Sequence, residues 1–550
     1  MGAREIISGP AFFPKNETVQ PGSLSIPPMH FLRFPACGTL LLLLCALSAR
    51  ADWVADVGYV KLQAELGAAC PKGVGVKFTQ VEVPESVGAY APMAGLGSVP
   101  VPGTGSFIGQ TFLLKSGAST ASAHALVVGS RAYSTYGLAS GVANVDVYDA
   151  NDWLVAGFLN YPTPEAPQIV VPLNESSHVQ NHSWIFNPSD SSPGQIAAFN
   201  NLLHRVDYSI NVDSSNRYLC CAGMNNYAGS AFPVVMASAF NVLAVGRSDG
   251  QHSQGVTSSS FDGGGRSKPE IVAPSDATSF ATGMVSGAGA VLRGVATTAN
   301  GQRTETLRAV LLAGATKEEF PAWTQTSTKP VDGVYGAGEL NIYNSYKILT
   351  VPEQTSHGTI PVTLTGWQHK PVLPNSTSDY ILNIPASQNG GSLSAALVWN
   401  RQVTFNGSGF NHVTPPNLKL TLYKGTSIPG TQVYQSDSAV DNLEHIWMPV
   451  LKCGTHRLRI GGGAFNTQAT LAWRFTPPAA SPGIKILSSA PIVLRFENLV
   501  LTQPYLIQVS TDLDGWSTAH NFTASSSTLT WNAPAMVGER CFYRLKWTCP

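Results

Sequence analysis

A change of pattern in the second half of the chain is the feature that most constrains its fold. From Gly75 to about Leu349, short apolar runs alternate with longer stretches that suit helices. This alternation is typical of βαβ units built around a parallel sheet. From about Pro352 onward the helical stretches stop, and short strands separated by Gly, Pro and Asn turns replace them. The sequence therefore predicts a doubly wound α/β domain followed by antiparallel β-sandwich-type domains.

The chain has 550 residues, more than one hydrophobic core usually supports, so we expect several domains. The boundaries are expected at 52–350 for the α/β domain, 352–476 for a β-sandwich and 483–550 for a smaller β domain. A Pro-rich linker separates the last two. In the α/β domain we expect strands at 76–83, 145–148, 169–171, 218–222 and 242–246, and helices at 121–130, 193–212, 279–296 and 302–313. In the sandwich we expect strands at 380–384, 394–399, 418–423, 455–460 and 469–475.

The N-terminal region indicates export. A basic residue, Arg33, precedes an apolar run at 38–47, which ends in Ala49-Arg50-Ala51. This pattern fits a signal peptide at 29–51, with cleavage after Ala51 and a secreted or extracytoplasmic mature protein. The apolar run is short for a membrane span, so we expect no transmembrane anchor. The polar, Pro-rich residues 1–28 are either a disordered extension or the result of an over-extended start, with Met29 as the initiator.

Charge and cysteine usage narrow the choice of partners. The 33 basic and 33 acidic residues balance, which gives no electrostatic reason to expect nucleic acid as a partner. In an oxidising compartment some cysteines could pair, and Cys541 and Cys549 are close enough in sequence to close a small loop. Cys220 and Cys221 suit a buried strand. No C-x-x-C spacing occurs, so the cysteines predict no zinc site.

The segment from Ala277 to Gly287 carries the clearest chemical signal. Thr278-Ser279 stands where a helix is expected to begin, and small residues follow at spacings that allow close packing of that helix. A serine in this position presents its hydroxyl at a helix N-terminus, where free N–H groups and the helix dipole stabilise a developing oxyanion. A serine hydroxyl also needs a base and a group that orients the base. His124, at the expected start of the helix at 121–130, is the candidate base.

This segment resembles the nucleophile motif of the subtilisin-like serine peptidases, Gly-Thr-Ser-x-Ala-x-Pro-x-Val-x-Gly. Ala277 replaces the first glycine of that motif, and Gly283 replaces its proline. Three further segments resemble the family, at 119–129 around the histidine, at 219–226 and at 267–274 before the serine. The resemblance covers about residues 70–350, in an order of acid, base, amide and serine.

The resemblance implies roles for particular residues. Ser279 would be the nucleophile, His124 the general base, and Glu82 the orienting acid in place of the usual aspartate, with Glu85 and Asp56 as lesser alternatives. Asn181 would donate to the oxyanion, although Asn181-His182-Ser183 is also a glycosylation sequon. The strand end at Ala222 and Gly223 would border the substrate.

Three functions are compatible with these patterns. The first is a secreted serine endopeptidase that hydrolyses proteins or peptides without a cofactor. Structural calcium is frequent in the family, but no calcium ligand set stands out, and Asp441, Glu444 and His445 are more typical of a turn than of a metal site. The second is a catalytically degenerate fold of the same type that binds a partner without cutting it. In the third, the C-terminal β domains contact a cell surface or polysaccharide.

Overall fold

The computed structural model describes residues 53–86, 88–92, 107–162, 168–174, 176–186, 192–211, 218–425, 427, 430–489, 491–534, 541–547 and 549. The expected extension at 1–28 and the expected signal peptide at 29–51 lie outside the described residues.

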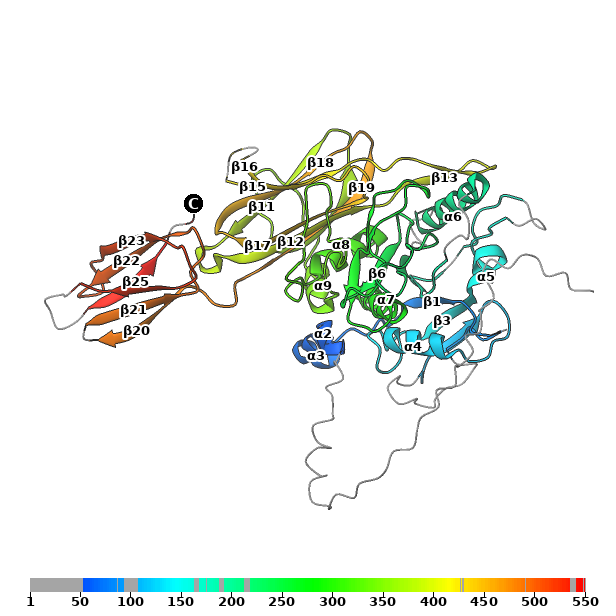
Figure 1. Ribbon diagram of the computed structural model, residues 1–550, viewed down its shortest axis with the longest axis horizontal. Helices are drawn as coiled ribbons and strands as arrows, with labels where there is room; N and C mark the ends of the chain where they lie inside the picture. The colour runs from blue at the N-terminus through cyan, green and yellow to red at the C-terminus, as the bar shows by residue number, and fades with distance from the viewer. Residues whose placement is uncertain are drawn as a thin grey trace, which may run out of the picture.

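A central sheet of seven parallel strands organises the first half of the chain (Figure 1). The spatial order is β2-β3-β1-β4-β5-β6-β9, so the order reverses at β1. Ligand sites of such sheets form at the carboxyl ends of the strands beside the reversal. The strands are β1 (Lys77–Glu82), β2 (Thr111–Leu114), β3 (Asn144–Asp149), β4 (Val179–His182), β5 (Leu219–Gly223), β6 (Leu243–Arg247) and β9 (Ile271–Ala273). The predicted α/β class with a parallel sheet is confirmed.

Helices cover both faces of this sheet because successive strand residues point to opposite sides. In β5, Leu219 and Cys221 pack into the cluster that holds α4, α7, α8 and α9, whereas Cys220 and Ala222 pack into the cluster that holds α6. The bounds are α2 (Trp53–Asp56), α3 (Tyr59–Leu66), η1 (Gly67–Ala69), α4 (Ala123–Ala132), α5 (Ala150–Asp152), η2 (Trp153–Gly157), α6 (Pro193–Asn211), α7 (Thr278–Val295), α8 (Thr304–Gly314) and α9 (Ile342–Leu349). Among the described residues, no helix combines the length and apolar character that a membrane span requires.

The small residues of α7 bring it close to both a helix and a strand. A Cβ atom at Gly283 would lie 2.7 Å from the carbonyl oxygen of Val128, and one at Gly287 would lie 2.8 Å from that of Ala132. Both contacts are with α4. A Cβ atom at Gly289 would lie 2.4 Å from the Leu219 side chain of β5. The predicted close packing of α7 is therefore present, and α7 packs closely against α4 as well as against the sheet.

The second half of the chain is antiparallel. Two four-stranded sheets, β10-β19-β12-β17 and β11-β18-β15-β16, enclose a common apolar core. Their strands are β10 (Thr365–Val372), β11 (Thr377–Ile384), β12 (Gly391–Trp399), β15 (Lys419–Lys424), β16 (Thr431–Ser436), β17 (Leu443–Leu451), β18 (Gly454–Gly461) and β19 (Thr467–Thr476), with η3 (Ala386–Gln388) between β11 and β12. A hairpin of β13 (Val403–Phe405) and β14 (Phe410–His412) extends from the sandwich to α6, and a short ribbon pairs β7 (Gly255–Val256) with β8 (Ser267–Lys268).

The C-terminal part forms two further three-stranded sheets around a smaller core. One sheet contains β20 (Gly483–Ser489), β21 (Ile492–Glu497) and β24 (Leu529–Asn532), and the other contains β22 (Pro504–Ser510), β23 (Ser517–Thr523) and β25 (Phe542–Lys546). Figure 1 shows this part at one end of the elongated molecule, beyond the sandwich.

Several expected elements differ from the observed ones. The run at 169–171 is not a strand: it is partly exposed, and its Val170 and Val171 carbonyl oxygens accept hydrogen bonds from Arg205 and Asn160. Three strands of the parallel sheet, β2, β4 and β9, were not predicted. The β4 sequence Val-Gln-Asn-His is mostly polar although it is fully buried, and β9 has only three residues, so neither shows a clear strand pattern.

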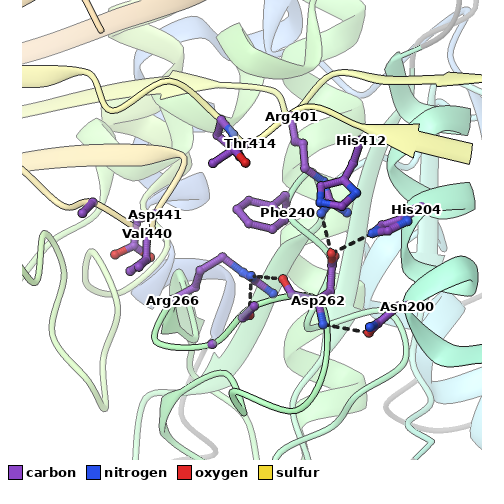
Figure 2. A pocket seen from close by; sticks show the side chains of 14 residues that line it. Asn200, His204, Phe240, Asp262, Arg266, Arg401, His412, Thr414, Val440 and Asp441 are labelled. Atoms are coloured by element: carbon purple, nitrogen blue, oxygen red, sulfur yellow. Dashed lines mark hydrogen bonds and ion pairs between the residues drawn. The ribbon is translucent and has the colours of Figure 1, made fainter. Parts of the chain in front are cut away.

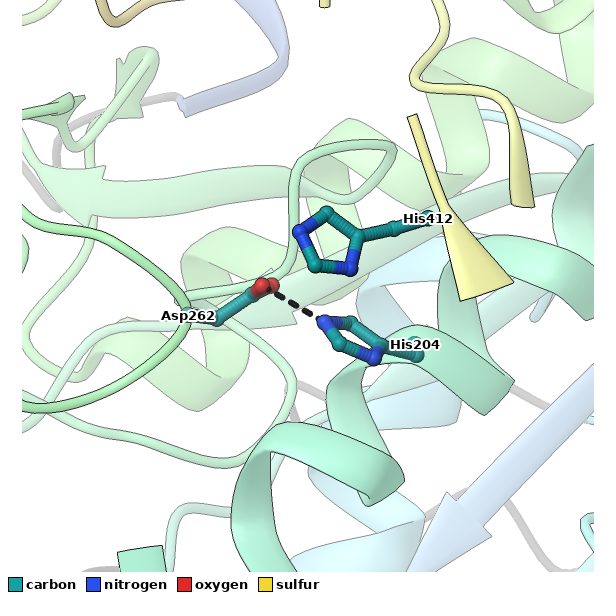
Figure 3. Close-up of side chains that lie close together, drawn as sticks. All are labelled: His204, Asp262 and His412. Atoms are coloured by element: carbon teal, nitrogen blue, oxygen red, sulfur yellow. Dashed lines mark hydrogen bonds and ion pairs between the residues drawn. The ribbon is translucent and has the colours of Figure 1, made fainter. Parts of the chain in front are cut away.

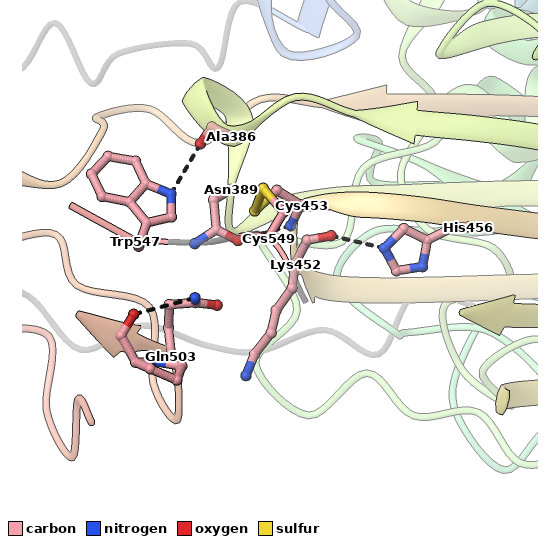
Figure 4. Close-up of a disulfide and its surroundings, with 9 residues drawn as sticks. Ala386, Asn389, Lys452, Cys453, His456, Gln503, Trp547 and Cys549 are labelled. Atoms are coloured by element: carbon pink, nitrogen blue, oxygen red, sulfur yellow. Dashed lines mark hydrogen bonds between the residues drawn. A yellow bond between two sulfur atoms is a disulfide. The ribbon is translucent and has the colours of Figure 1, made fainter. Parts of the chain in front are cut away.

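The disulfide differs from the expected pairing. Cys453, at the start of β18, is bonded to Cys549, and Cys541 is free (Figure 4). The bond joins the sandwich to the end of the chain across a separation of 96 residues. Trp547 beside it donates to the carbonyl oxygen of Ala386 in the sandwich (3.3 Å). The expected small loop between Cys541 and Cys549 is therefore wrong, because tertiary contacts place Cys549 against β18. A disulfide is typical of an oxidising compartment.

The disulfide should be a measurable part of the stability of the C-terminal region. Closing a loop of this length restricts the unfolded chain, and loss of a native disulfide typically costs about 2–4 kcal/mol. We expect Cys549→Ser to lower the Tm in calorimetry. Cys541→Ser is the matched control and should leave the Tm nearly unchanged. Equal losses in both variants would contradict the observed pairing.

Candidate active site

A buried carboxylate at the end of β1 is the centre of the candidate site. Glu82 is the last residue of β1, beside the reversal of strand order, and its side chain is only 1% exposed. Its Oε2 accepts a hydrogen bond from Nδ1 of His124 at 2.8 Å. Its Oε1 accepts from the side-chain amide of Gln80 at 2.6 Å. The structure therefore brings together the predicted acid and the predicted base.

Gln80 fixes this carboxylate, and sequence analysis did not identify it. Its amide nitrogen also donates to the carbonyl oxygen of Ala125 in α4 (2.9 Å), and its amide oxygen accepts from the hydroxyl of Tyr133. His182 Nε2 lies 3.2 Å from the same amide oxygen. Because strand residues two apart share a face, Gln80 lies on the Glu82 side of β1. The spacing of two residues between Gln80 and Glu82 in a strand could have identified Gln80 as a neighbour of the acid.

The start of α4 places His124. Ser122 is the N-cap, and its hydroxyl accepts from the N–H of Ala125 at 3.0 Å. Glu85 accepts from the N–H groups of Ala123 (2.6 Å) and His124 (3.2 Å). Glu85, a lesser alternative for the acid, is therefore a cap of the helix that carries the base. Asp56, the other alternative, lies in α2.

Two effects compete on the charge of the imidazole. Burial opposes protonation of His124 and lowers its pKa, but the hydrogen bond that His124 donates to Glu82, the charge of Glu82 and the charge of Glu85 together raise the pKa more. The pKa of His124 is therefore raised above its ordinary value of 6.5. This arrangement fixes the tautomer with its proton on Nδ1 and leaves Nε2 as the acceptor.

Ser279 lies in the first turn of α7. The preceding Ala277 is the N-cap with an extended backbone (φ −144°, ψ 144°), a conformation that does not require the glycine of the family motif. Thr278 is anchored by two bonds: its N–H donates to Oδ1 of Asn226 (2.9 Å), and its hydroxyl donates to the carbonyl oxygen of Met224 (2.7 Å). The N–H groups of Phe280 (3.2 Å) and Ala281 (3.1 Å) donate to the carbonyl oxygen of Ala277.

The Ser279 hydroxyl donates to the main-chain carbonyl of Ser183 at 3.2 Å and not to His124. In return, the hydroxyl of Ser183 donates to the carbonyl oxygen of Ser279 at 2.8 Å. His124 is nevertheless close, because its ring centroid lies 5.9 Å from that of Phe280, the neighbour of Ser279. Because α4 packs closely on α7, the first turn of α4 lies near the first turn of α7.

Asn181 has a different environment from the one its predicted role requires. It lies inside β4 with no exposed surface. Its amide nitrogen donates to Ser183 (2.9 Å), and its amide oxygen accepts from the hydroxyl of Ser286 (3.0 Å). An oxyanion donor must be accessible to substrate, so this placement argues against the oxyanion role of Asn181. Asn181 instead orients Ser183 by donating a hydrogen bond to its hydroxyl.

A small cavity of about 100 Å³ lies beside Ser279. It is lined by Ser183, Trp184, Ile185, Gly223, Met224, Asn225, Asn226, Thr278 and Ser279. Of the two residues predicted to border the substrate, Gly223 lines this cavity, whereas Ala222 is fully buried and does not. Neither asparagine of this lining was predicted, although both belong to the 219–226 segment that resembles the family.

The segment that raised the question of a metal is a hydrogen-bonded turn. Asp441 accepts from the hydroxyl of Ser438 (2.7 Å) and from the N–H of Ser267 (2.8 Å). Glu444 accepts from the N–H of Ser438 (2.7 Å), and His445 is fully buried. The carboxylates thus hold the turn, as the sequence favoured.

Comparisons with known proteins give little further support. No protein-family model and no curated protein matches the chain. Among solved structures, the Aeromonas sobria serine protease in complex with the chaperone ORF2 is similar with a TM-score of 0.35 and 12% identity, over 74% of this chain and 88% of that chain. An α-L-fucosidase from Bacteroides ovatus (TM-score 0.14, 11% identity, 40% and 43% coverage) and a β-1,2-glucanase from Parabacteroides distasonis (0.13, 11%, 35% and 35%) also match. Scores of this size do not establish a shared fold.

Replacement of Glu82 should change the titration of His124. The Glu82→Gln variant removes the groups that raise the His124 pKa most, so we expect that pKa to fall. Glu85→Gln is the matched control and should lower the pKa less, because the charge of Glu85 is the smallest of the three effects that raise it. The measurement is an NMR titration of the imidazole, assigned by comparison with His124→Ala. A larger fall in Glu85→Gln than in Glu82→Gln would contradict the geometry.

Proposed function

We propose that this protein is a secreted serine endopeptidase of the subtilisin-like type, which hydrolyses peptide bonds in proteins through an acyl-enzyme on Ser279. The observation that carries the proposal is the bond between the buried Glu82 carboxylate and His124, next to a serine in the first turn of a helix. Because the proposed nucleophile, base and acid are all side chains of the protein, the proposed reaction needs no cofactor.

The proposed reaction uses these residues in sequence. Ser279 attacks the peptide carbonyl carbon while His124 takes the hydroxyl proton on Nε2, and Glu82 stabilises the imidazolium that forms. His124 then donates this proton to the leaving amine as the peptide C–N bond breaks. Water, deprotonated by His124, hydrolyses the acyl-enzyme and regenerates Ser279. The first step requires the Ser279 hydroxyl to rotate from Ser183 toward His124, and catalytic hydrogen bonds often tighten only when substrate binds.

Asn226 is the proposed oxyanion donor in place of Asn181. Its Oδ1 accepts from the N–H of Thr278, so the amide orientation leaves Nδ2 as the free donor. In the described part of the chain, Nδ2 of Asn226 has no hydrogen-bond partner, and the residue lines the cavity beside Ser279. The N–H of Ser279, at the positive end of α7, is the second donor.

The alternative is a degenerate fold that binds a partner without cutting it. The engagement of the Ser279 hydroxyl by the Ser183 carbonyl favours this alternative, because a hydroxyl held there is not activated. Contact of the C-terminal β sheets with a cell surface or polysaccharide stays a prediction from the sequence.

A fluorophosphonate probe distinguishes the two functions. An activated Ser279 attacks the phosphorus and becomes covalently labelled. We expect one label per chain in the wild type and none in Ser279→Ala. Ser275→Ala, earlier in the same segment, is the control and should label normally. A folded wild type that neither labels nor cleaves any member of a peptide library would support the binding alternative.

The oxyanion proposal has its own test. Asn226→Asp keeps an acceptor for Thr278 but replaces the amide donor, so we expect kcat to fall by about 100- to 1,000-fold. The matched variant Asn181→Ala should lower the Tm with a smaller effect on kcat, because Asn181 acts through Ser183. Thermal melts check that Asn226→Asp is folded. Unchanged kcat in Asn226→Asp would remove Asn226 from the mechanism.

A further inference from the structure

A second cavity, of about 320 Å³, lies where the parallel-sheet part meets the sandwich (Figure 2). Its walls come from α6, from the loop that contains Asp262, and from the β13–β14 hairpin and the segment that follows it. The charged and aromatic side chains in its walls include Phe240, Arg266, Arg401 and Asp441. The reaction proposed for Ser279 uses none of these residues.

Three side chains in this cavity offer metal ligands. His204 of α6, Asp262 and His412 of β14 each present one nitrogen or carboxylate oxygen, and these atoms all lie within 4.8 Å of one another. His204 Nε2 is 2.9 Å from Asp262 Oδ1, and the two imidazole rings lie 4.3 Å apart between centroids. Figure 3 shows both rings and the carboxylate directed toward one another from separate elements.

Only one of the two carboxylate oxygens of Asp262 has a partner among the described residues. Its Oδ1 forms an ion pair with Arg401 (2.6 Å), and its N–H donates to Asn200 (2.8 Å). Its Oδ2 is buried and has no hydrogen-bond partner among the described residues. The backbone of Asp262 is left-handed (φ 54°), a conformation that aspartate tolerates better than most residues other than glycine.

The position of His412 gives an ion access to these ligands. His412 is the exposed member of the three, so its ring offers a path of entry into the cavity. Metal binding requires neutral imidazoles and an ionised carboxylate, so affinity for the ion should fall as the pH is lowered.

We propose that His204, Asp262 and His412 bind a zinc-type transition-metal ion, with a fourth position open to water. Two imidazoles and one carboxylate favour zinc or a related ion over calcium and magnesium, which prefer oxygen ligands. Tetrahedral Zn²⁺ with ligands at about 2.0–2.1 Å separates the ligand atoms by about 3.3 Å. The ligand atoms lie within 4.8 Å of one another, so side-chain rotations must shorten the longest of these separations by up to about 1.5 Å.

Arg401 has two opposing effects on this site. It pairs with Asp207 (2.5 Å) as well as with Asp262, so its charge is shared between two carboxylates. Its ion pair with Oδ1 restrains the Asp262 carboxylate, as outer partners of metal-binding carboxylates do. Its positive charge also weakens cation binding. A hydroxide or another anion in the open position offsets this charge.

The metal would link two parts of the chain. His204 belongs to a helix on the parallel sheet, and His412 belongs to the sandwich hairpin. Binding would therefore stabilise the contact between α6 and β14. This function goes beyond peptide hydrolysis, and its test does not depend on whether Ser279 is active.

The test is titration of the full chain with Zn²⁺ by calorimetry, in a Cys541→Ser background that removes the accessible free thiol. We expect one equivalent to bind and the Tm to rise with Zn²⁺ by linkage. His412→Ala, at an exposed position, should lower the affinity at least about tenfold and abolish the rise in Tm. His520→Ala, an exposed histidine on β23, is the matched control and should bind like the parent.

Cobalt provides a second measurement. Co²⁺ bound by two imidazoles and a carboxylate should give visible absorption bands in the parent and in His520→Ala but not in His412→Ala. Absence of zinc binding by the folded parent would overturn the proposal. So would equal affinity in the parent and His412→Ala, because the metal would then be bound elsewhere.

Discussion

The close contact between α4 and α7 is the constraint on which the candidate site depends. Gly283 and Gly287 let α7 approach the carbonyl oxygens of α4, where a Cβ atom would be too close. Each helix carries one reactive side chain in its first turn, His124 on α4 and Ser279 on α7. Because the helices pack at this short distance, the imidazole of His124 lies against Phe280, the neighbour of Ser279.

The buried Glu82 carboxylate imposes a second requirement. A charge that is almost fully removed from water is costly unless hydrogen bonds and an opposite charge compensate it. Gln80 and His124 supply those bonds, and Tyr133 and Ala125 hold Gln80 in turn. The orientation of the imidazole is thus fixed by a network that runs from the strand into α4. From this position at the end of β1, Glu82 reaches Nδ1 of His124 at 2.8 Å.

A buried ionic cluster joins the two halves of the molecule. Glu270, just before β9, is bonded by Lys268 and Arg308 at 2.9 Å each, and Arg308 of α8 also donates to Asn400, which follows β12. α8 packs directly on β12 and β19 of the sandwich. The cavity with His204, Asp262 and His412 also lies between the two halves, but α6 and the β13–β14 hairpin contribute to its walls and α8 does not. The sandwich is therefore part of the environment of the α/β unit and not a separate appendage.

The sequence by itself predicted the change from α/β to antiparallel β structure and the acid, base and serine candidates. Apolar patterning marked α4, α6, α7 and α8 and the strands β1, β3, β5, β6, β11, β12, β15, β18 and β19, and helix-start chemistry marked Ser279 and His124. Tertiary structure alone decided the rest. The polar strand β4 is buried because neighbouring strands satisfy its backbone, which no periodicity reveals. Likewise Gln80, Asn226, the Cys453–Cys549 bond and the histidine pair depend on contacts between distant segments, and single-sequence patterns report only local geometry.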